Sequence, residues 1–132
     1  MAIKVLIVDD TRTIRYQIRE MLAGTDYELD EATNGQEALL RIGQHKPHII
    51  LMDIMMPNMN GIECCKLIKS DEKTKDIKVV MVTTKGEYNK VTEAFRAHCD
   101  DYITKPIKQS ELLSKMDEIS KMVSARMKLR IL

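Results

Sequence analysis

Five polar residues that could do chemistry follow directly on runs of aliphatic residues. Asp9 and Asp10 follow the first such run, Asp53 follows a second, Thr83 ends a third, and Lys105 comes after a fourth. If these runs are neighbouring parallel strands, all five side chains emerge at one carboxyl edge of the sheet. That edge is where open α/β sheets bind their ligands.

The predicted meeting of three carboxylates indicates a metal ion. Carboxylates held close together repel one another unless a cation joins them. Oxygen ligands suit a hard cation, most simply Mg²⁺. A carboxylate beside a lysine and a hard cation suggests phosphoryl transfer to an aspartate, because the two positive charges offset the repulsion between carboxylate and phosphate.

The apolar pattern alternates between two periods, and this alternation predicts the elements that position these residues. Strand-like runs lie near 3–8, 27–32, 48–53, 77–83 and 100–104. Helical stretches lie near 12–23, 35–45, 60–69, 87–97 and from about 109 to 128. Short connections between them predict an α/β fold, a doubly wound parallel sheet covered by helices on both faces. The second run carries Glu28, Asp30 and Glu31, which favours an edge strand.

Length and composition exclude several classes of protein. The 132 residues predict one domain with a single core. The 21 Lys and Arg against 20 Asp and Glu leave a net charge of +1, so no overall field favours nucleic acid or an anionic membrane. We expect no membrane span, since no apolar run reaches about 18 residues, and no signal peptide at the start.

The cysteines indicate neither disulfides nor zinc. They are three, an odd number, which does not suggest a disulfide framework, and we expect a cytoplasmic protein. Cys64, Cys65, His98 and Cys99 lack the CxxC spacing of a zinc site. Buried small residues are the preferred interpretation of the thiols.

Residues 3–120 resemble the receiver domain of bacterial two-component response regulators, in its single-domain, CheY-like form. Four motifs carry the resemblance in the family's order, each near the end of a predicted strand: Val8-Asp9-Asp10, the segment 52–61 that contains Asp53, Val82-Thr83-Thr84, and Tyr102-Ile103-Thr104-Lys105-Pro106. The resemblance implies a five-stranded sheet of order 2-1-3-4-5 flanked by five helices, a flavodoxin-like fold. We expect residues 1–120 to form the receiver, and 121–132 to extend the last helix as a basic tail.

The resemblance also implies roles in the site. Asp53 is the implied phosphoacceptor, and Lys105, whose bond to Pro106 is expected to be cis, supplies positive charge beside it. Asp9, Asp10, Asp53 and the backbone carbonyl of Met55 are the implied ligands of Mg²⁺. For Asp9 the alternative interpretation is an N-terminal cap on the first helix.

Thr83 and Tyr102 are the switch pair that the resemblance implies. The Thr83 hydroxyl would bind a new phosphoryl oxygen, and Tyr102 would then move from an exposed to a buried rotamer. That movement would change the face made by the fourth helix, fifth strand and fifth helix. The alternative for Tyr102 is a static aromatic on an edge strand.

The implied partners are a sensor histidine kinase or phosphotransfer protein as donor and a downstream protein as target. A homodimer through the same face is a further possibility. We expect no direct contact with nucleic acid and no activity as a metabolic enzyme. Arg12, Arg15 and Arg19 on the first helix indicate either a kinase-docking face or a solvated one.

Two alternative functions stay open. The chain could be the amino-terminal input domain of a larger DNA-binding or diguanylate-cyclase regulator. It could also be a pseudo-receiver that binds partners without phosphorylation, although Asp10, Asp53, Thr83 and Lys105 favour a working receiver.

Five positions depart from the family pattern, including Cys99, which stands beside His98 where the family usually has alanine. Thr84 replaces a small residue and could narrow the path to Asp53. His98 replaces a glycine that serves as a left-handed helix cap, so it either adopts that backbone conformation or ends the helix differently. Met55 and Lys85 occupy positions where an amide or acid often orients the attacking water. Because methionine cannot do so, we expect a slowly hydrolysing aspartyl phosphate.

Overall fold

Five strands and five α-helices alternate along the chain, as the apolar pattern predicts. The structure is a computed structural model that describes residues 2–131, apart from the side chains of Lys85, Tyr88, Arg130 and Ile131. The strands are β1 (Lys4–Val8), β2 (Glu28–Ala32), β3 (Ile49–Asp53), β4 (Lys78–Thr84) and β5 (Asp101–Lys105). The α-helices are α1 (Arg12–Leu22), α2 (Gly35–Gln44), α3 (Gly61–Ser70), α4 (Tyr88–Arg96) and α5 (Gln109–Ile131), and the 3-10 turn η1 (Lys85–Glu87) precedes α4.

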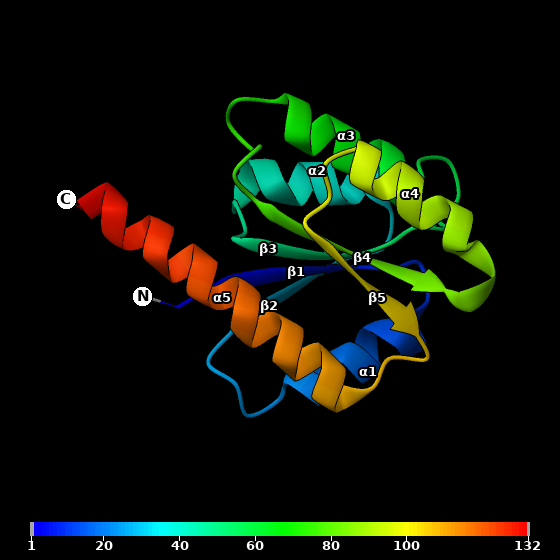
Figure 1. Cartoon of the computed structure of the whole chain (residues 1–132), viewed down its shortest axis with the longest axis horizontal. Helices are drawn as coiled ribbons and strands as arrows, with labels where there is room; N and C mark the ends of the chain where they lie inside the picture. Colours follow the sequence, from blue (N-terminus) through cyan, green and yellow to red (C-terminus); the bar gives the residue numbers. More distant parts are fainter. Residues whose placement is uncertain (1, 132) are drawn as a thin grey trace.

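All five strands are parallel, in the order β2-β1-β3-β4-β5 (Figure 1). This confirms the expected fold and strand order. The strand rich in acidic residues, β2, lies at an edge, as its composition predicts. Every residue of β3 is buried, because that strand lies at the centre of the sheet with helices on both of its faces.

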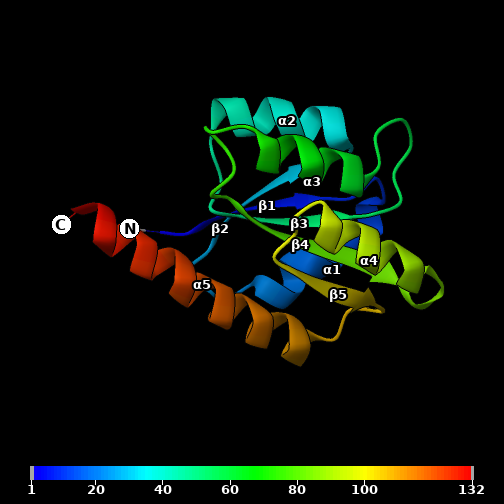
Figure 2. The same ribbon diagram turned by 45° about the horizontal axis from the view of Figure 1, so that its top comes forward.

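Two hydrophobic clusters fill the space on either side of the sheet. Helices α1 and α5 cover one face, and α2, α3 and α4 cover the other (Figures 1 and 2). Alternate residues of the strands supply the two clusters: Met52 and Met81 belong to the first, Leu51 and Val80 to the second. This alternation fixes which face each strand-end side chain leaves from.

Helix α5 is the longest element and runs without a break from Gln109 to Ile131. Its first turns pack on the sheet through Leu112, Met116, Ile119 and Val123, the stripe expected from the sequence. Its last turns extend past the body of the domain, where Leu129 is 71% exposed (Figure 1). Within the part of the chain that is described, no helix has the length and apolar character needed to cross a membrane.

The chain adopts a left-handed backbone conformation after α4. His98 has φ of 69°, so this histidine takes the conformation for which the family uses glycine. The first of the two expectations for His98 is therefore confirmed. The neighbouring Asp100 carboxylate fixes the next segment, because it accepts hydrogen bonds from the Val79 backbone at 2.7 Å and from Lys69 Nζ at 2.8 Å.

Candidate functional site

The ends of β1, β3 and β5 bring two carboxylates and one ammonium together at the carboxyl edge of the sheet. Lys105 Nζ lies 3.1 Å from Asp9 Oδ2 and 3.4 Å from Asp53 Oδ1. Asp9 is 1% exposed and Asp53 6% exposed, so the lysine joins two buried charges. The peptide bond between Lys105 and Pro106 is cis, as the resemblance implies.

A third carboxylate completes the cluster. Ligand atoms of Asp9, Asp10 and Asp53 all lie within 4.8 Å of one another, and Asp10 is exposed. Among the described residues this is the one group of His, Cys, Asp and Glu side chains arranged to hold a metal ion. Three carboxylates make an all-oxygen donor set of the type that Mg²⁺ prefers, so the residues fit the expected cation.

Asp9 binds the backbone at Thr11 as well as the side chain of Lys105. Its Oδ1 accepts a hydrogen bond from the Thr11 backbone N–H at 2.8 Å, while Oδ2 faces Lys105. The N-cap residue of α1 is Thr11, so Asp9 is not the helix cap of the alternative interpretation. One of its oxygens fixes the turn that leads into α1, and the other belongs to the pocket. With both oxygens of Asp9 engaged, the exposed Asp10 is better placed to face a cation directly.

The pocket contains three carboxylates and one ammonium group. Burial and the neighbouring Asp9 charge raise the pKa of Asp53 to about 6, even though Lys105 acts in the opposite direction. Burial on its own would lower the pKa of Lys105, but Asp53 and Asp9 outweigh it and the net effect raises that pKa. The single ammonium group therefore does not fully offset the negative charge of the carboxylates. A divalent cation would offset the remainder.

Thr83 lies beside the pocket, at the end of β4. Asp53 pairs in register with Val82, and the Ile54 backbone N–H donates to the Val82 carbonyl at 3.1 Å, so Thr83 follows immediately. Thr83 is 1% exposed. Its hydroxyl is hydrogen-bonded to Glu87 Oε2 at 3.1 Å and to the Thr84 carbonyl at 3.2 Å. The hydroxyl thus points toward the start of α4 rather than toward the carboxylates.

Tyr102 lies on β5 between two helices. Its ring makes an edge contact with Phe95 of α4, with centroids 6.0 Å apart, and Lys115 Nζ of α5 lies 5.6 Å from the ring centroid. Lys115 also pairs with Asp101 at 3.0 Å. Tyr102 is partly buried against the core and connects the three elements of the expected output face.

Two of the residues that depart from the family pattern follow the strand ends of the site and are exposed. The Met55 side chain is 53% exposed on the loop after β3, and Thr84 is exposed at the end of β4. Thr84 therefore faces solvent instead of packing over the buried Asp53. The side chain of Lys85 lies outside the described residues.

Two arginines of α1 connect this helix to the strands next to the pocket. Arg15 Nη1 donates to the Asp9 carbonyl at 2.8 Å, and its Nε pairs with Glu31 of β2 at 2.9 Å. Arg19 also pairs with Glu31. Burial alone would raise the pKa of Glu31, but the two guanidinium groups outweigh it and lower that pKa. Neither sequence interpretation of these arginines anticipated this role, because helical spacing shows which residues share a face but not what lies opposite.

The thiols lie apart from this chemistry. Cys64, Cys65 and Cys99 are free and buried, and burial raises the pKa of each to about 12. They therefore stay protonated at neutral pH and pack as small core residues, as the sequence indicates.

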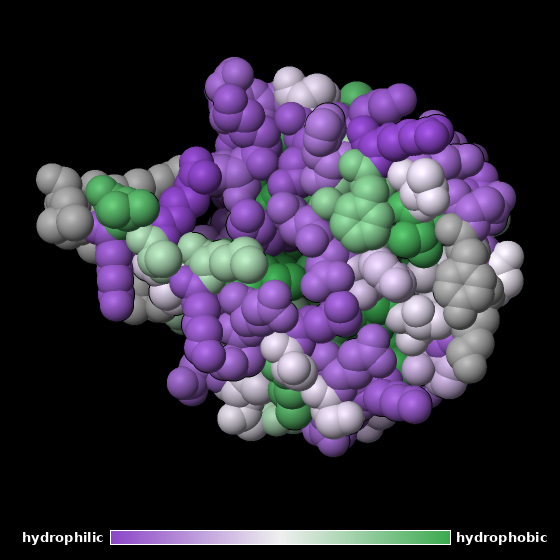
Figure 3. All heavy atoms as spheres, in the orientation of Figure 1, coloured by the Kyte–Doolittle hydropathy of each residue, from purple (hydrophilic) through white to green (hydrophobic). Residues whose placement is uncertain are grey.

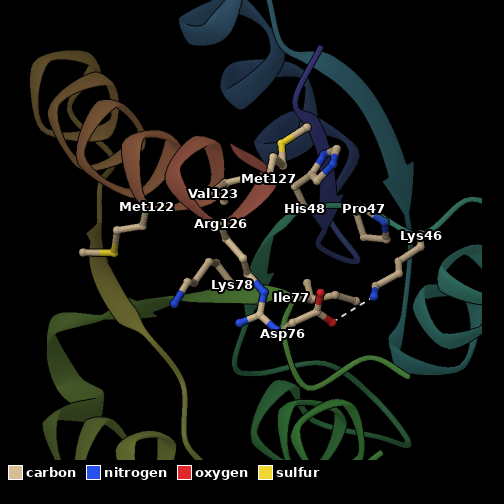
Figure 4. Close-up of a pocket in the computed structure, with 10 residues that line it drawn as sticks. All are labelled: Lys46, Pro47, His48, Asp76, Ile77, Lys78, Met122, Val123, Arg126 and Met127. Atoms are coloured by element: carbon tan, nitrogen blue, oxygen red, sulfur yellow. Dashed lines mark hydrogen bonds and ion pairs between the residues drawn. The ribbon is translucent and has the colours of Figure 1, made fainter. Parts of the chain in front are cut away.

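A cavity of about 110 Å³ lies at the opposite edge of the sheet, below the last turns of α5 (Figure 4). Lys46, Asp76 and Met127 are among its lining residues, and Lys46 pairs with Asp76 across it at 2.8 Å. It is at the amino ends of the strands, away from Asp53. The carboxylate pocket, at the carboxyl edge, is therefore the stronger candidate for the functional site.

Comparison with known proteins points to one family. Residues 5–117 match the family model described as the response regulator receiver domain. The phosphate regulon transcriptional regulatory protein PhoB of Pseudomonas aeruginosa is 41% identical over 115 residues, which are 87% of this chain and 50% of PhoB. The chemotaxis protein CheY of Thermotoga maritima is 37% identical over 123 residues, which are 92% of this chain and 100% of CheY.

Solved structures agree with this result. A putative response regulator from Chloroflexus aurantiacus superposes with a TM-score of 0.86 at 30% identity, covering 90% of this chain and 98% of that one. The chemotaxis protein CheY4 of Vibrio cholerae gives 0.83 at 28% identity, covering 90% and 99%. The chain thus spans the whole of some relatives and about half the length of others, such as PhoB.

Proposed function

The chain belongs to the family of response regulator receiver domains, and on that premise we propose that Asp53 accepts a phosphoryl group from a phosphohistidine. The donor is a sensor histidine kinase or a phosphotransfer protein. The observation that carries the proposal is the convergence of three carboxylates and Lys105 at the carboxyl edge of the sheet. The protein is a signalling receiver, not a catalytic enzyme in the usual sense.

Each residue of the pocket has a task in this transfer. An Asp53 oxygen attacks phosphorus while the bond from phosphorus to the histidine nitrogen breaks, and the imidazole leaves with that electron pair. Lys105, already 3.4 Å from Asp53, is placed to offset the negative charge of the phosphoryl oxygens. Asp10, Asp53 and the Met55 carbonyl would hold Mg²⁺. Asp9 would hold the site in place through its contacts with Lys105 and the Thr11 backbone. Bound there, the cation supplies the charge that lets phosphate approach a carboxylate.

We further propose that phosphorylation is reported through Thr83 and Tyr102 to a partner protein. Tyr102 supports this because its ring contacts both α4 and α5. In the space-filling view, hydrophobic residues on the face formed by α4, β5 and α5 are dispersed among hydrophilic ones (Figure 3). Such a mixed surface suits a reversible partner whose affinity changes with phosphorylation. A homodimer through the same face is the other assembly that it would permit.

Intact mass tests the proposal. After incubation with Mg²⁺ and a small phosphodonor such as acetyl phosphate, we expect the wild type to gain one phosphoryl group. The Asp53→Asn variant should gain none, because an amide is not a competent nucleophile. If the wild type gains no mass even with several histidine kinases as donors, the chain is a pseudo-receiver that binds partners without phosphorylation.

A second candidate is the input domain of a larger regulator. The observation that favours it is the length of relatives such as PhoB, a transcriptional regulatory protein of which this chain matches 50%. The same phosphorylation would then control an attached output domain, DNA-binding or nucleotide-cyclising. The length of the gene decides between the two. In either case we infer a cytoplasmic location, where histidine kinases have access to ATP.

The exposed Met55 should make the aspartyl phosphate long-lived. Replacing it by asparagine places an amide that can orient water beside Asp53, and we expect decay to accelerate about 3- to 10-fold. Phosphorylated protein, freed of donor, would be followed by intact mass over time. Met122→Asn makes the same change on α5, also at an exposed methionine, and should leave the rate unaltered. An unchanged rate for Met55→Asn would contradict the prediction.

A further inference from the structure

The side chain of Glu87 folds back from the start of α4 onto the end of β4. Its Oε2 accepts hydrogen bonds from the Thr83 hydroxyl at 3.1 Å and from the Thr84 backbone N–H at 3.3 Å. Glu87 is the N-cap residue of α4, yet its carboxylate makes no capping hydrogen bond to that helix. The Glu87 carboxylate therefore binds the end of β4 beside the pocket and does not cap α4.

This contact competes with the contact that phosphorylation needs. A threonine hydroxyl carries one proton and can donate one full hydrogen bond at a time. Of its two acceptors, the Glu87 carboxylate is charged and the Thr84 carbonyl is neutral, so the carboxylate is the stronger. A phosphoryl oxygen on Asp53 can accept a hydrogen bond from the Thr83 hydroxyl only after that hydroxyl has broken its bond to Glu87.

We propose that Glu87 is a positioning residue that holds Thr83 in the unphosphorylated arrangement, and that its release transmits phosphorylation to the start of α4. This inference rests on the proposed function of Asp53. The phosphoryl group drives the release in two ways. It offers Thr83 an acceptor of higher charge, and its negative charge repels the Glu87 carboxylate from the strand end.

The release would affect α4 directly because of where Glu87 lies in the chain. It ends the turn η1 (Lys85–Glu87) and immediately precedes the first residue of α4. Loss of both its hydrogen bonds to β4 frees the turn from the strand. Phe95, two turns further along α4, contacts Tyr102, so movement at the start of the helix reaches the ring expected to switch.

The test is the affinity for beryllofluoride, which binds a carboxylate and mimics a phosphoryl group, measured with Mg²⁺ by NMR titration of backbone amides. Glu87→Ala removes the competing acceptor, and we expect binding to tighten about 3- to 10-fold. Glu93→Gln is the matched control. It also removes a carboxylate from α4, one that pairs with Lys90 at 3.6 Å and does not contact Thr83. Its affinity should equal that of the wild type.

Repeating the measurement in a Thr83→Val variant separates the effect of the Glu87 hydrogen bond to Thr83 from the effect of the Glu87 charge. With Thr83→Val in place the hydroxyl is gone, and Glu87→Ala should tighten binding clearly less than it does with Thr83 present, because only the charge repulsion is then relieved. Equal tightening in both backgrounds, or no tightening in the first, would overturn the proposal. A role of Glu87 in stability alone would lower the melting temperature and leave binding unchanged or weaker. If the wild type itself binds no beryllofluoride, the proposed function of Asp53 fails and the inference falls with it.

Discussion

Replacing Lys105 by methionine should destabilise the metal-free protein by about 3 kcal/mol at about pH 8. Lys105 is the cation in contact with both Asp9 and Asp53, at 3.1 and 3.4 Å. Both carboxylates are buried, so without the ammonium they repel each other in a medium that screens poorly. Methionine keeps most of the volume of the side chain, which separates the loss of charge from the loss of packing.

The loss should depend on pH in a defined direction. The pKa of Asp53 is raised from 3.8 to about 6, so the folded protein binds a proton there more readily than the unfolded chain. The ionised Asp53 therefore destabilises the folded protein. This destabilisation is fully present above about pH 6 and disappears as the pH falls toward 3.8. Without Lys105 this pKa rises further. The difference between wild type and variant should therefore shrink on acidification.

Urea unfolding at a series of pH values measures this effect. Lys108→Met removes the same charge from an exposed position three residues further along and should change stability by less than about 0.5 kcal/mol. Asp53→Asn should shift stability in the opposite direction, because it removes a charge that repels Asp9. Mg²⁺ should narrow the gap between Lys105→Met and the wild type. A loss no larger than that of Lys108→Met would contradict this account.

The sequence was sufficient to place the elements and the residues at their ends. Each predicted strand lies within one residue of the observed bounds, because β-branched and aliphatic runs end abruptly at polar residues such as Asp53. In a parallel sheet those ends meet at one edge, so the gathering of Asp9, Asp53 and Lys105 followed from topology alone. Roles within the pocket came from family resemblance, since no spacing distinguishes a phosphoacceptor from a metal ligand.

Contacts between elements could not be predicted in the same way. Arg15 of α1 pairs with Glu31 of β2, and Glu87 at the end of η1 accepts a hydrogen bond from Thr83 of β4. The first contact depends on how α1 packs beside the sheet and the second on the path of the turn after β4, and apolar periodicity encodes neither. The start of α4 illustrates this. The pattern predicts a helix near 87–97, within one residue of α4 at each end, but it does not predict the 3-10 turn that places Glu87 against Thr83.

Gly61→Ala should destabilise the protein by about 3 kcal/mol and slow phosphorylation at the same time. Gly61 opens α3 close behind Asp53, the proposed phosphoacceptor, and its backbone N–H donates to the Ile54 carbonyl at 2.8 Å. A Cβ at this position would overlap the backbone oxygen of Asp53 and come within 2.8 Å of the end of the Met81 side chain. The methionine can move, but the Asp53 backbone can move only by shifting the pocket itself.

The matched control for this substitution is Gly43→Ala near the end of α2, where an added Cβ meets nothing within 4 Å. Alanine is the better helix former, so this change should stabilise the protein by about 0.5 kcal/mol and leave phosphorylation unaffected. Thermal unfolding and intact mass after donor treatment measure both effects in one preparation. Equal behaviour of the two variants would show that the close approach of α3 to Asp53 is not required. Opposite changes in stability, together with slower phosphorylation in Gly61→Ala alone, would show that the start of α3 and Asp53 are positioned together.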